Sequence, residues 1–412
     1  MRLLKFFLIA ILIAIPFPIG YSLLEQSFLA SSKPNLFNGD LLKTDIPSNY
    51  YPSGTEAFFD IPKGPLKGKK IFYYDMMIGN DGQPAPAITL LFIHGNRTSS
   101  YIYHDVIALL KEKSPPVRIV ALDLIGFGLS DRAPFPISPE EHSETILLFT
   151  KHLNLSDIVL VTHEWGAPLG IHALLSAPER VQGLFLINST VFKLMPMDTI
   201  SYAYPIPLFG YSRISSLIPG FLWGKYTAYS IFSPPSLSTL IKLDIMKNLA
   251  MGNHPRTGGL KDAEVQFYEN HLRSKENTSN SRYLLKRTAC FKKGGDPSCE
   301  TFTRFIDENL HEKWGPGGLN IHVAALFGDQ DMCSDPVIID KWKTALPQIE
   351  DHVKILRDAG HFLQKESPET VAEMIRELIV AVKIAPIPVE EVLPVTPITE
   401  LNEETLNEAE GL

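Results

Sequence analysis

The stretch Ile158-Val-Leu-Val-Thr-His-Glu164-Trp-Gly166-Ala-Pro-Leu-Gly170 decides the fold. It runs from an apolar segment through a tight turn into a helical pattern. A nucleophile elbow needs small residues two places before and after the nucleophile, because the neighbouring backbone leaves little room for side chains. Thr162 and Gly166 meet this spacing. The turn therefore presents Glu164 at the start of a helix, whose N-terminal amides favour a carboxylate. The chain has no Gly-x-Ser-x-Gly, so a serine esterase would lack its nucleophile.

Apolar, strand-like runs alternate with helical patterns on both sides of this stretch. The runs lie at residues 70–74, 87–93, 118–122, 158–162, 183–188, 322–327 and 352–357. Helices are expected at residues 101–113, 140–153, 167–177 and 368–382. Such alternation predicts an α/β protein with a mainly parallel sheet flanked by helices.

The alternation fails between residues 191 and 310, where Pro, Tyr, Phe and Leu crowd into irregular stretches. We interpret this segment as an inserted helical cap, which would close an apolar pocket over the sheet. The alternative is a helical subdomain without a catalytic role. The core then comprises residues 50–190 and 311–383. Residues 384–412 are Pro-rich and then Glu-rich, which predicts a solvated, disordered tail.

Residues 1–30 predict a signal anchor or a signal peptide. Arg2 and Lys5 precede an apolar run over residues 6–24, which is near the roughly 20 residues that span a bilayer. The cleavage pattern is poor, which favours an uncleaved membrane anchor with the catalytic body on the non-cytoplasmic side. The alternative is cleavage near Ala30 and secretion.

Composition narrows the classes of partner. The 412 residues carry 38 basic and 46 acidic side chains, a mild and dispersed balance that argues against nucleic acid and favours a small-molecule substrate. Three cysteines are too few for a disulfide scaffold. Cys290 and Cys299 flank a short polar loop and could pair if the chain is exported.

A second polar turn follows the apolar run Leu91-Phe-Ile, which leads into His94-Gly95-Asn96. Glycine there lets the backbone approach a ligand. In hydrolases with an elbow, the amide after such a His-Gly pair supplies half of an oxyanion hole, worth roughly 10²–10³ in rate per donor.

A carboxylate and a histidine follow the elbow in the order that this chemistry needs. One strand ends in Gly-Asp329-Gln-Asp331 and the next in Asp-Ala-Gly-His361. An acid at the first turn can fix the tautomer of the imidazole, whose other nitrogen then activates water. We predict Asp331 and His361. Asp329 is the alternative acid, and either aspartate could be a structural turn residue.

Four motifs together resemble haloalkane dehalogenases, over residues 50–190 and 305–382. They are His94-Gly-Asn-Arg-Thr-Ser-Ser-Tyr101, Asp123-Leu-Ile-Gly-Phe-Gly-Leu-Ser-Asp131, His163-Glu-Trp-Gly166 and Gly360-His-Phe-Leu-Gln364. The resemblance implies an α/β-hydrolase fold and a small apolar, halogenated substrate. It also implies that Asn96 and Trp165 bind the leaving halide through their side chains and the oxyanion through their backbone amides. Epoxide hydrolases share the elbow pattern but usually carry a different residue, leading into Pro, after His-Gly.

The resemblance implies a covalent alkyl-enzyme ester, hydrolysed by water that His361 and Asp331 activate, with no metal or organic cofactor. Asn188 stands where one subfamily carries its acid, so Asp331 fits the other subfamily. Trp223 is a guess for a second halide-binding residue in the cap.

Glu164 departs from the family, whose nucleophile is Asp. The additional methylene moves the carboxylate by roughly 1.5 Å, and a misplacement of about 1 Å can cost roughly 10²-fold in rate. It should also offset the ester carbonyl from its oxyanion donors. The alternatives to a hydrolase with a Glu nucleophile are a membrane-tethered, catalytically impaired binding protein and an epoxide hydrolase.

Overall fold

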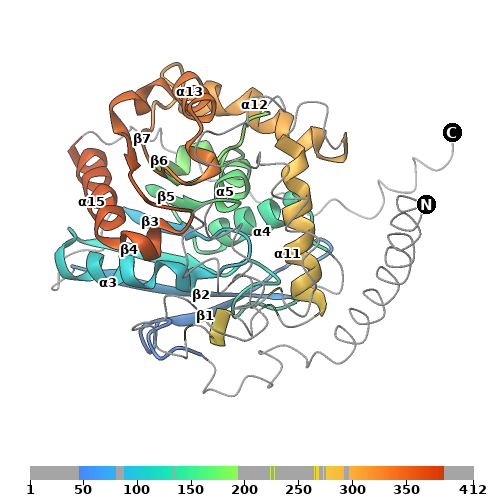
Figure 1. Ribbon diagram of the computed structural model, residues 1–412. Helices are drawn as coiled ribbons and strands as arrows, with labels where there is room; N and C mark the ends of the chain where they lie inside the picture. Colours follow the sequence, from blue (N-terminus) through green and yellow to red (C-terminus); the bar gives the residue numbers. More distant parts are fainter. Residues whose placement is uncertain are drawn as a thin grey trace, which may run out of the picture.

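The computed structural model is built around an eight-stranded sheet with the order β1-β2-β4-β3-β5-β6-β7-β8 (Figure 1). It describes residues 46–79, 88–132, 136–193, 275–291 and 297–384, with single positions between 223 and 272. The strands are β1 (Glu56–Asp60), β2 (Lys70–Ile78), β3 (Thr89–Ile93), β4 (Val117–Leu122), β5 (Ile158–His163), β6 (Val181–Ile187), β7 (His322–Gly328) and β8 (Val353–Leu356).

The sheet is parallel from β4 to β8, and β2 runs antiparallel to both β1 and β4. The seven predicted strands are all present. Strand β1 was not predicted, because this five-residue edge strand has only one buried residue, Phe59. The central strands β3, β5 and β6 are buried throughout, as expected for strands that helices cover on both faces.

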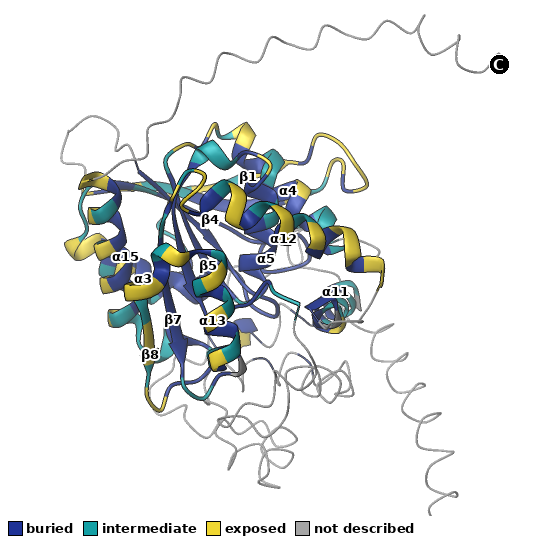
Figure 2. Cartoon of the chain, turned by 90° about the horizontal axis from the view of Figure 1, so that it is seen from above, coloured by how far each residue is buried: buried dark blue, intermediate teal, exposed yellow. Residues whose placement is uncertain are grey.

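Helices pack on both faces of the sheet (Figure 1). On one face, α3 (His104–Lys113) packs against α15 (Pro368–Ile384). On the other, α5 (Gly166–Leu174) packs against α4 (Pro139–His152) and α12 (Glu300–Trp314), and α13 (Pro336–Ala345) completes the layer. Two apolar cores result, one on each side of the sheet. Figure 2 shows the buried central strands between the helices, whose exposed residues lie on their outer faces.

The buried carboxylate of Asp123 joins three parts of the chain at the end of β4. It accepts hydrogen bonds from the Tyr50 hydroxyl and from the amides of Ser100 and Leu129, each at 2.7 Å. Burial raises its pKa, although these donors oppose the shift. Gly128 lies so close that a side chain there would collide with the Asp123 carboxylate. These contacts explain why the motif combines Asp123 with a glycine at position 128.

An ionic cluster of three buried side chains and the more exposed Asp105 joins Glu264, from the predicted cap, to the core. Lys365 Nζ lies 2.6 Å from Asp105 and 3.5 Å from Glu264, and His104 Nε2 lies 2.9 Å from Asp105 and 3.4 Å from Glu264. Removing one partner of such a cluster strands a buried charge, at a cost of about 3–5 kcal/mol. The cluster therefore contributes mainly by fixing where this segment docks.

Several predicted segments lie outside the described residues. They are the N-terminal anchor at residues 1–30, most of the cap, and the tail beyond Ile384. Of the helices that the structure describes, none combines the length and apolar character needed to cross a bilayer. The domain limits and the membrane anchor stay predictions.

Candidate active site

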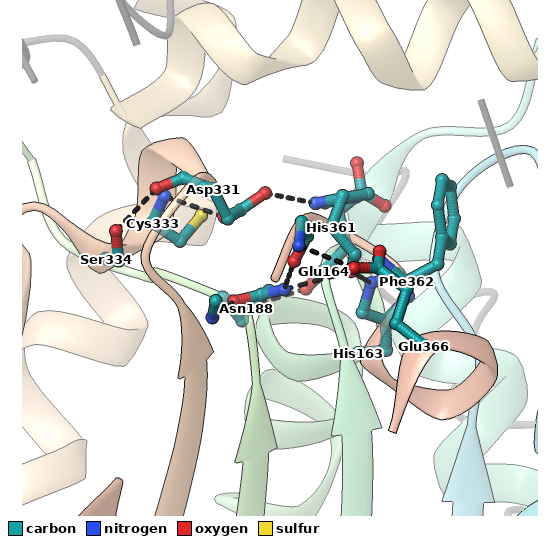
Figure 3. Close-up of polar contacts among 12 residues, drawn as sticks. His163, Glu164, Asn188, Asp331, Cys333, Ser334, His361, Phe362 and Glu366 are labelled. Carbon is teal, nitrogen blue, oxygen red and sulfur yellow. Dashed lines mark hydrogen bonds and ion pairs between the residues drawn. The ribbon is translucent and has the colours of Figure 1, made fainter. Parts of the chain in front are cut away.

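The elbow at the end of β5 has the expected geometry. Glu164 has a φ of +48°, the left-handed region that non-glycine residues rarely adopt. Gly166 begins α5, and a Cβ there would run into the carbonyl oxygen of Ile93 on the neighbouring strand. The hydroxyl of Thr162 donates to the carbonyl of Phe185. The turn therefore projects Glu164 from the sheet, as Figure 3 shows.

One oxygen of the Glu164 carboxylate is held by two backbone amides. Oε2 accepts from the Asn96 amide at 2.6 Å and from the Trp165 amide at 2.9 Å. In the free protein, the longer carboxylate thus reaches both amides. The expected offset of the ester carbonyl from these donors stays a prediction. Oε1 is the oxygen left for chemistry.

His361 and Asp331 form the second half of the site. Asp331 Oδ2 lies 2.6 Å from His361 Nδ1, and the Asp331 side chain is 1% exposed. Its other oxygen accepts from the Cys333 amide at 2.8 Å. Asp331, not the alternative Asp329, is thus the carboxylate that bonds the imidazole, which leaves Nε2 for proton transfer. Figure 3 shows Asp331, His361 and Glu164 gathered beyond the carboxyl ends of the strands.

The two titrating groups influence each other. Burial raises the pKa of Glu164, an effect that the charges of His361 and Arg97 and the two amides oppose. Burial lowers the pKa of His361, but the charge and hydrogen bond of Asp331, together with Glu164, outweigh it and leave that pKa raised. The pKa of each group therefore lies above its ordinary value.

Two polar side chains hold the loop that carries His361. Asn188 donates to the carbonyls of Gly360 and His361, both at 2.9 Å, and accepts from the Gly328 amide at 2.9 Å. Glu366 accepts from the Gly360 amide at 2.6 Å and from the Phe362 amide at 3.1 Å.

No role for Asn188 in holding this loop was predicted from the sequence, and neither was the role of Glu366. The only signal for Glu366 was a carboxylate shortly after the His361 turn. Ser189 was also missed, although its hydroxyl donates to the backbone carbonyl of Glu164 at 2.7 Å. Arg97 follows Asn96 in the sequence and is 6% exposed. Its positive charge opposes the rise in the pKa of Glu164 that burial causes.

The side chains of Asn96 and Trp165 are both 3% exposed. Asn96 bonds to Ser281 of helix α11 (Lys275–Arg287), and the Trp165 ring packs against Phe291 with centroids 5.4 Å apart. Cys290, beside Phe291, forms a disulfide with Cys299, the pairing that the sequence suggested.

Trp223 does not match the guess that it is a second halide-binding residue. Its indole nitrogen donates to Ser281 Oγ at 3.0 Å, and an indole has only this one N–H to give.

Within the described residues, no group of three or more His, Cys, Asp or Glu side chains could hold a metal ion.

Known proteins similar to this chain agree on one family. The sequence model of the alpha/beta hydrolase family matches residues 90–374. Haloalkane dehalogenase 2 of Mycobacterium tuberculosis is 25% identical over 296 residues, which are 70% of this chain and 86% of that protein. A haloalkane dehalogenase of Sphingobium indicum is 34% identical over 153 residues, which are 36% of this chain and 45% of that protein.

Solved structures support the same fold. The crystal structure of the haloalkane dehalogenase DatA from Agrobacterium tumefaciens has a TM-score of 0.56 and 17% identity, covering 80% of this chain and 98% of that one. A haloalkane dehalogenase variant from Bradyrhizobium elkanii has a TM-score of 0.55 and 18% identity, covering 80% and 97%. With its eight-stranded sheet, its elbow and these relatives, the chain belongs to the alpha/beta hydrolase family and within it resembles the haloalkane dehalogenases.

Proposed function

We propose that the protein hydrolyses a carbon–halogen bond of a small apolar substrate through an ester on Glu164. In the first step, Glu164 Oε1 attacks the saturated carbon that bears the halogen. A carbon–oxygen bond forms, the carbon–halogen bond breaks, and the halide leaves with the bonding electron pair. The side-chain N–H groups of Asn96 and Trp165 would stabilise that developing negative charge.

Water then hydrolyses the ester. It attacks the Glu164 carboxyl carbon and gives a proton to Nε2 of His361, while Asp331 stabilises the imidazolium. The tetrahedral oxyanion forms on the oxygen that the Asn96 and Trp165 amides already hold. Its collapse releases the alcohol, which takes up the proton, and leaves one water oxygen on Glu164. The net reaction converts R–X and water into R–OH, a halide ion and a proton.

The observation that carries this proposal is the pair of amide hydrogen bonds to Oε2. Donors aimed at the developing oxyanion need no rearrangement during the reaction, which is the main source of electrostatic catalysis. The same contact fixes Oε1 as the attacking atom. One methylene more than an aspartate therefore does not separate the nucleophile from its oxyanion hole.

The test is a single turnover of 1-bromobutane by the native protein in water enriched in ¹⁸O. We expect one bromide and one unlabelled butanol per active site, with ¹⁸O in the Glu164-containing peptide by mass spectrometry. Label in the alcohol would mean that water attacks the substrate directly and would contradict the ester. No bromide release from this or other short bromoalkanes would contradict the proposal as a whole.

The pH dependence should show an acid limb in turnover. Ester hydrolysis needs neutral His361, whose pKa is raised by Asp331 and Glu164 against the effect of burial. The neutral fraction falls as the pH falls through that value, so kcat should decline below a midpoint above the ordinary histidine value of about 6.5. The measurement is kcat between pH 5 and 9 for native protein and Asp331→Asn. Loss of the Asp331 charge should shift the midpoint down, and an unmoved midpoint would assign the limb to another group.

The second candidate is a catalytically impaired binding protein, favoured by the replacement of the family's Asp by Glu164. It predicts that the native protein binds bromoalkanes without turnover and that Glu164→Asp is active. The two amide bonds to Oε2 weigh against it, because the longer carboxylate still contacts both proposed oxyanion donors.

A further inference from the structure

Ser281 connects helix α11 to the side chain of Asn96. The Asn96 Nδ2 donates to the Ser281 carbonyl at 3.0 Å, and the Ser281 hydroxyl donates to Asn96 Oδ1 at 2.9 Å. Both side chains are buried, Ser281 at 0% exposure. A single serine thus contacts both ends of the carboxamide.

The donors in this network determine which way the carboxamide faces. An indole N–H can only donate, so the bond from Trp223 Nε1 makes Ser281 Oγ the acceptor. That bond uses one acceptor position of the hydroxyl, and the hydroxyl hydrogen points toward Asn96 Oδ1. The Ser281 backbone carbonyl can only accept, so it must face Nδ2. Exchange of the amide's oxygen and nitrogen would set Oδ1 against this carbonyl, two acceptors facing each other, and break that bond.

The neighbouring residue anchors α11 to the core. Asn280 donates to the Ile125 carbonyl at 3.2 Å and accepts from the Ile137 amide at 3.1 Å. Ser281 is consequently held in place from the core side, independently of its contact with Asn96. Ser281 can therefore fix the orientation of the Asn96 side chain without moving with it.

We propose that Ser281, supported by Trp223, is the positioning residue that directs the second N–H of the Asn96 carboxamide toward the leaving halide. This inference rests on the proposed function. An amide nitrogen carries two N–H groups, and Ser281 uses one of them. A reversed carboxamide would present its oxygen to the halide and repel it. A residue of helix α11 thus contributes to the preference of the site for a halide ion by orienting the Asn96 carboxamide.

The first experiment measures bromide affinity by quenching of tryptophan fluorescence. Ser281→Ala should weaken bromide binding about three- to tenfold, the effect of one hydrogen bond. In the Asn96→Ala background, Ser281→Ala should have no further effect. Ser279→Ala, on the same helix, is the matched control and should bind bromide like the native protein. Native affinity in Ser281→Ala, or an equal loss in both backgrounds, would overturn the inference.

A second measurement tests the orientation without halide or turnover. The Asn96 side-chain amide gives a pair of NMR signals, identified by their loss in Asn96→Ala. We expect Ser281→Ala to shift this pair and speed its exchange with water at unchanged thermal stability, and unchanged signals would overturn the inference. If these signals depend on Ser281 but bromoalkanes are not turned over, only the proposed function fails. If bromoalkanes are turned over and Ser281→Ala binds bromide with native affinity, only this inference fails.

Discussion

The Glu164→Gln protein should release bromide from short bromoalkanes at least about 10⁴-fold more slowly than the native protein. Glutamine has nearly the shape of glutamate, and its oxygen can still accept from the amides of Asn96 and Trp165. Only the anionic nucleophile is lost. The fold should therefore persist while the ester can no longer form.

Glu164→Asp separates the two candidate functions. Shortening the side chain withdraws the carboxylate by roughly 1.5 Å from amides that Oε2 contacts at 2.6 and 2.9 Å. We expect it to be roughly 10²-fold slower than native. An inactive native protein with an active Glu164→Asp variant would contradict the proposal and support the impaired binding protein.

The measurement is bromide release, with the thermal midpoint of each variant recorded. Glu369→Gln, an exposed charge neutralisation on α15, is the matched control and should match native activity. Mass spectrometry of Glu164→Gln is needed at the start and end of the assay, because hydrolysis of the glutamine would regenerate the native side chain. Native turnover in a verified Glu164→Gln sample would exclude Glu164 as the nucleophile.

His361→Gln should stop the reaction at the ester. Alkylation needs only the Glu164 carboxylate, whereas hydrolysis needs a base, whose loss costs typically 10²–10⁴-fold. Glutamine can still donate to Asp331, which avoids leaving that 1%-exposed carboxylate without a partner. The variant should release about one bromide per active site at a near-native rate and then nearly stop.

The intermediate should be visible by mass. After reaction with 1-bromobutane, the peptide containing Glu164 should carry one butyl group in His361→Gln and none in Glu164→Gln. His152→Gln, at an exposed position on α4, is the matched control and should turn over like the native protein without accumulating ester. A slow steady rate without a burst or a butylated peptide would place His361 in the first step instead.

The parts of the site that follow local patterns could be predicted from the sequence. The elbow at Glu164, the turn at Asn96 and the turns carrying Asp331 and His361 each combine an apolar strand with a polar turn. Parallel strands bring their carboxyl ends to one edge, so these four residues were expected together, and the structure brings them together. The mainly parallel direction of the central strands follows from the same alternation, whereas their order was not predicted.

The parts that depend on long-range contacts could not be predicted. Asn188 and Glu366 act on backbone groups of the His361 loop, and no spacing rule identifies such partners. Ser281 lies 185 residues from Asn96 in the sequence. The contact of Glu164 Oε2 with both amides belongs to the same class. Side-chain length is known from the sequence, but the backbone positions of the donor amides are not.

The Asn188 side chain has a consequence for how activity arises during folding. Its amide group bonds backbone atoms of residues that lie 140, 172 and 173 positions away in the sequence. The His361 loop therefore cannot be held in this way until the ends of β6 and β7 have come together. Contacts of such separation form late, because chain entropy must be lost before they stabilise anything. Partly folded chains should therefore carry an elbow without its base. Such a chain would lack the base that the proposed ester hydrolysis needs, so complete turnover depends on the docking of the His361 loop.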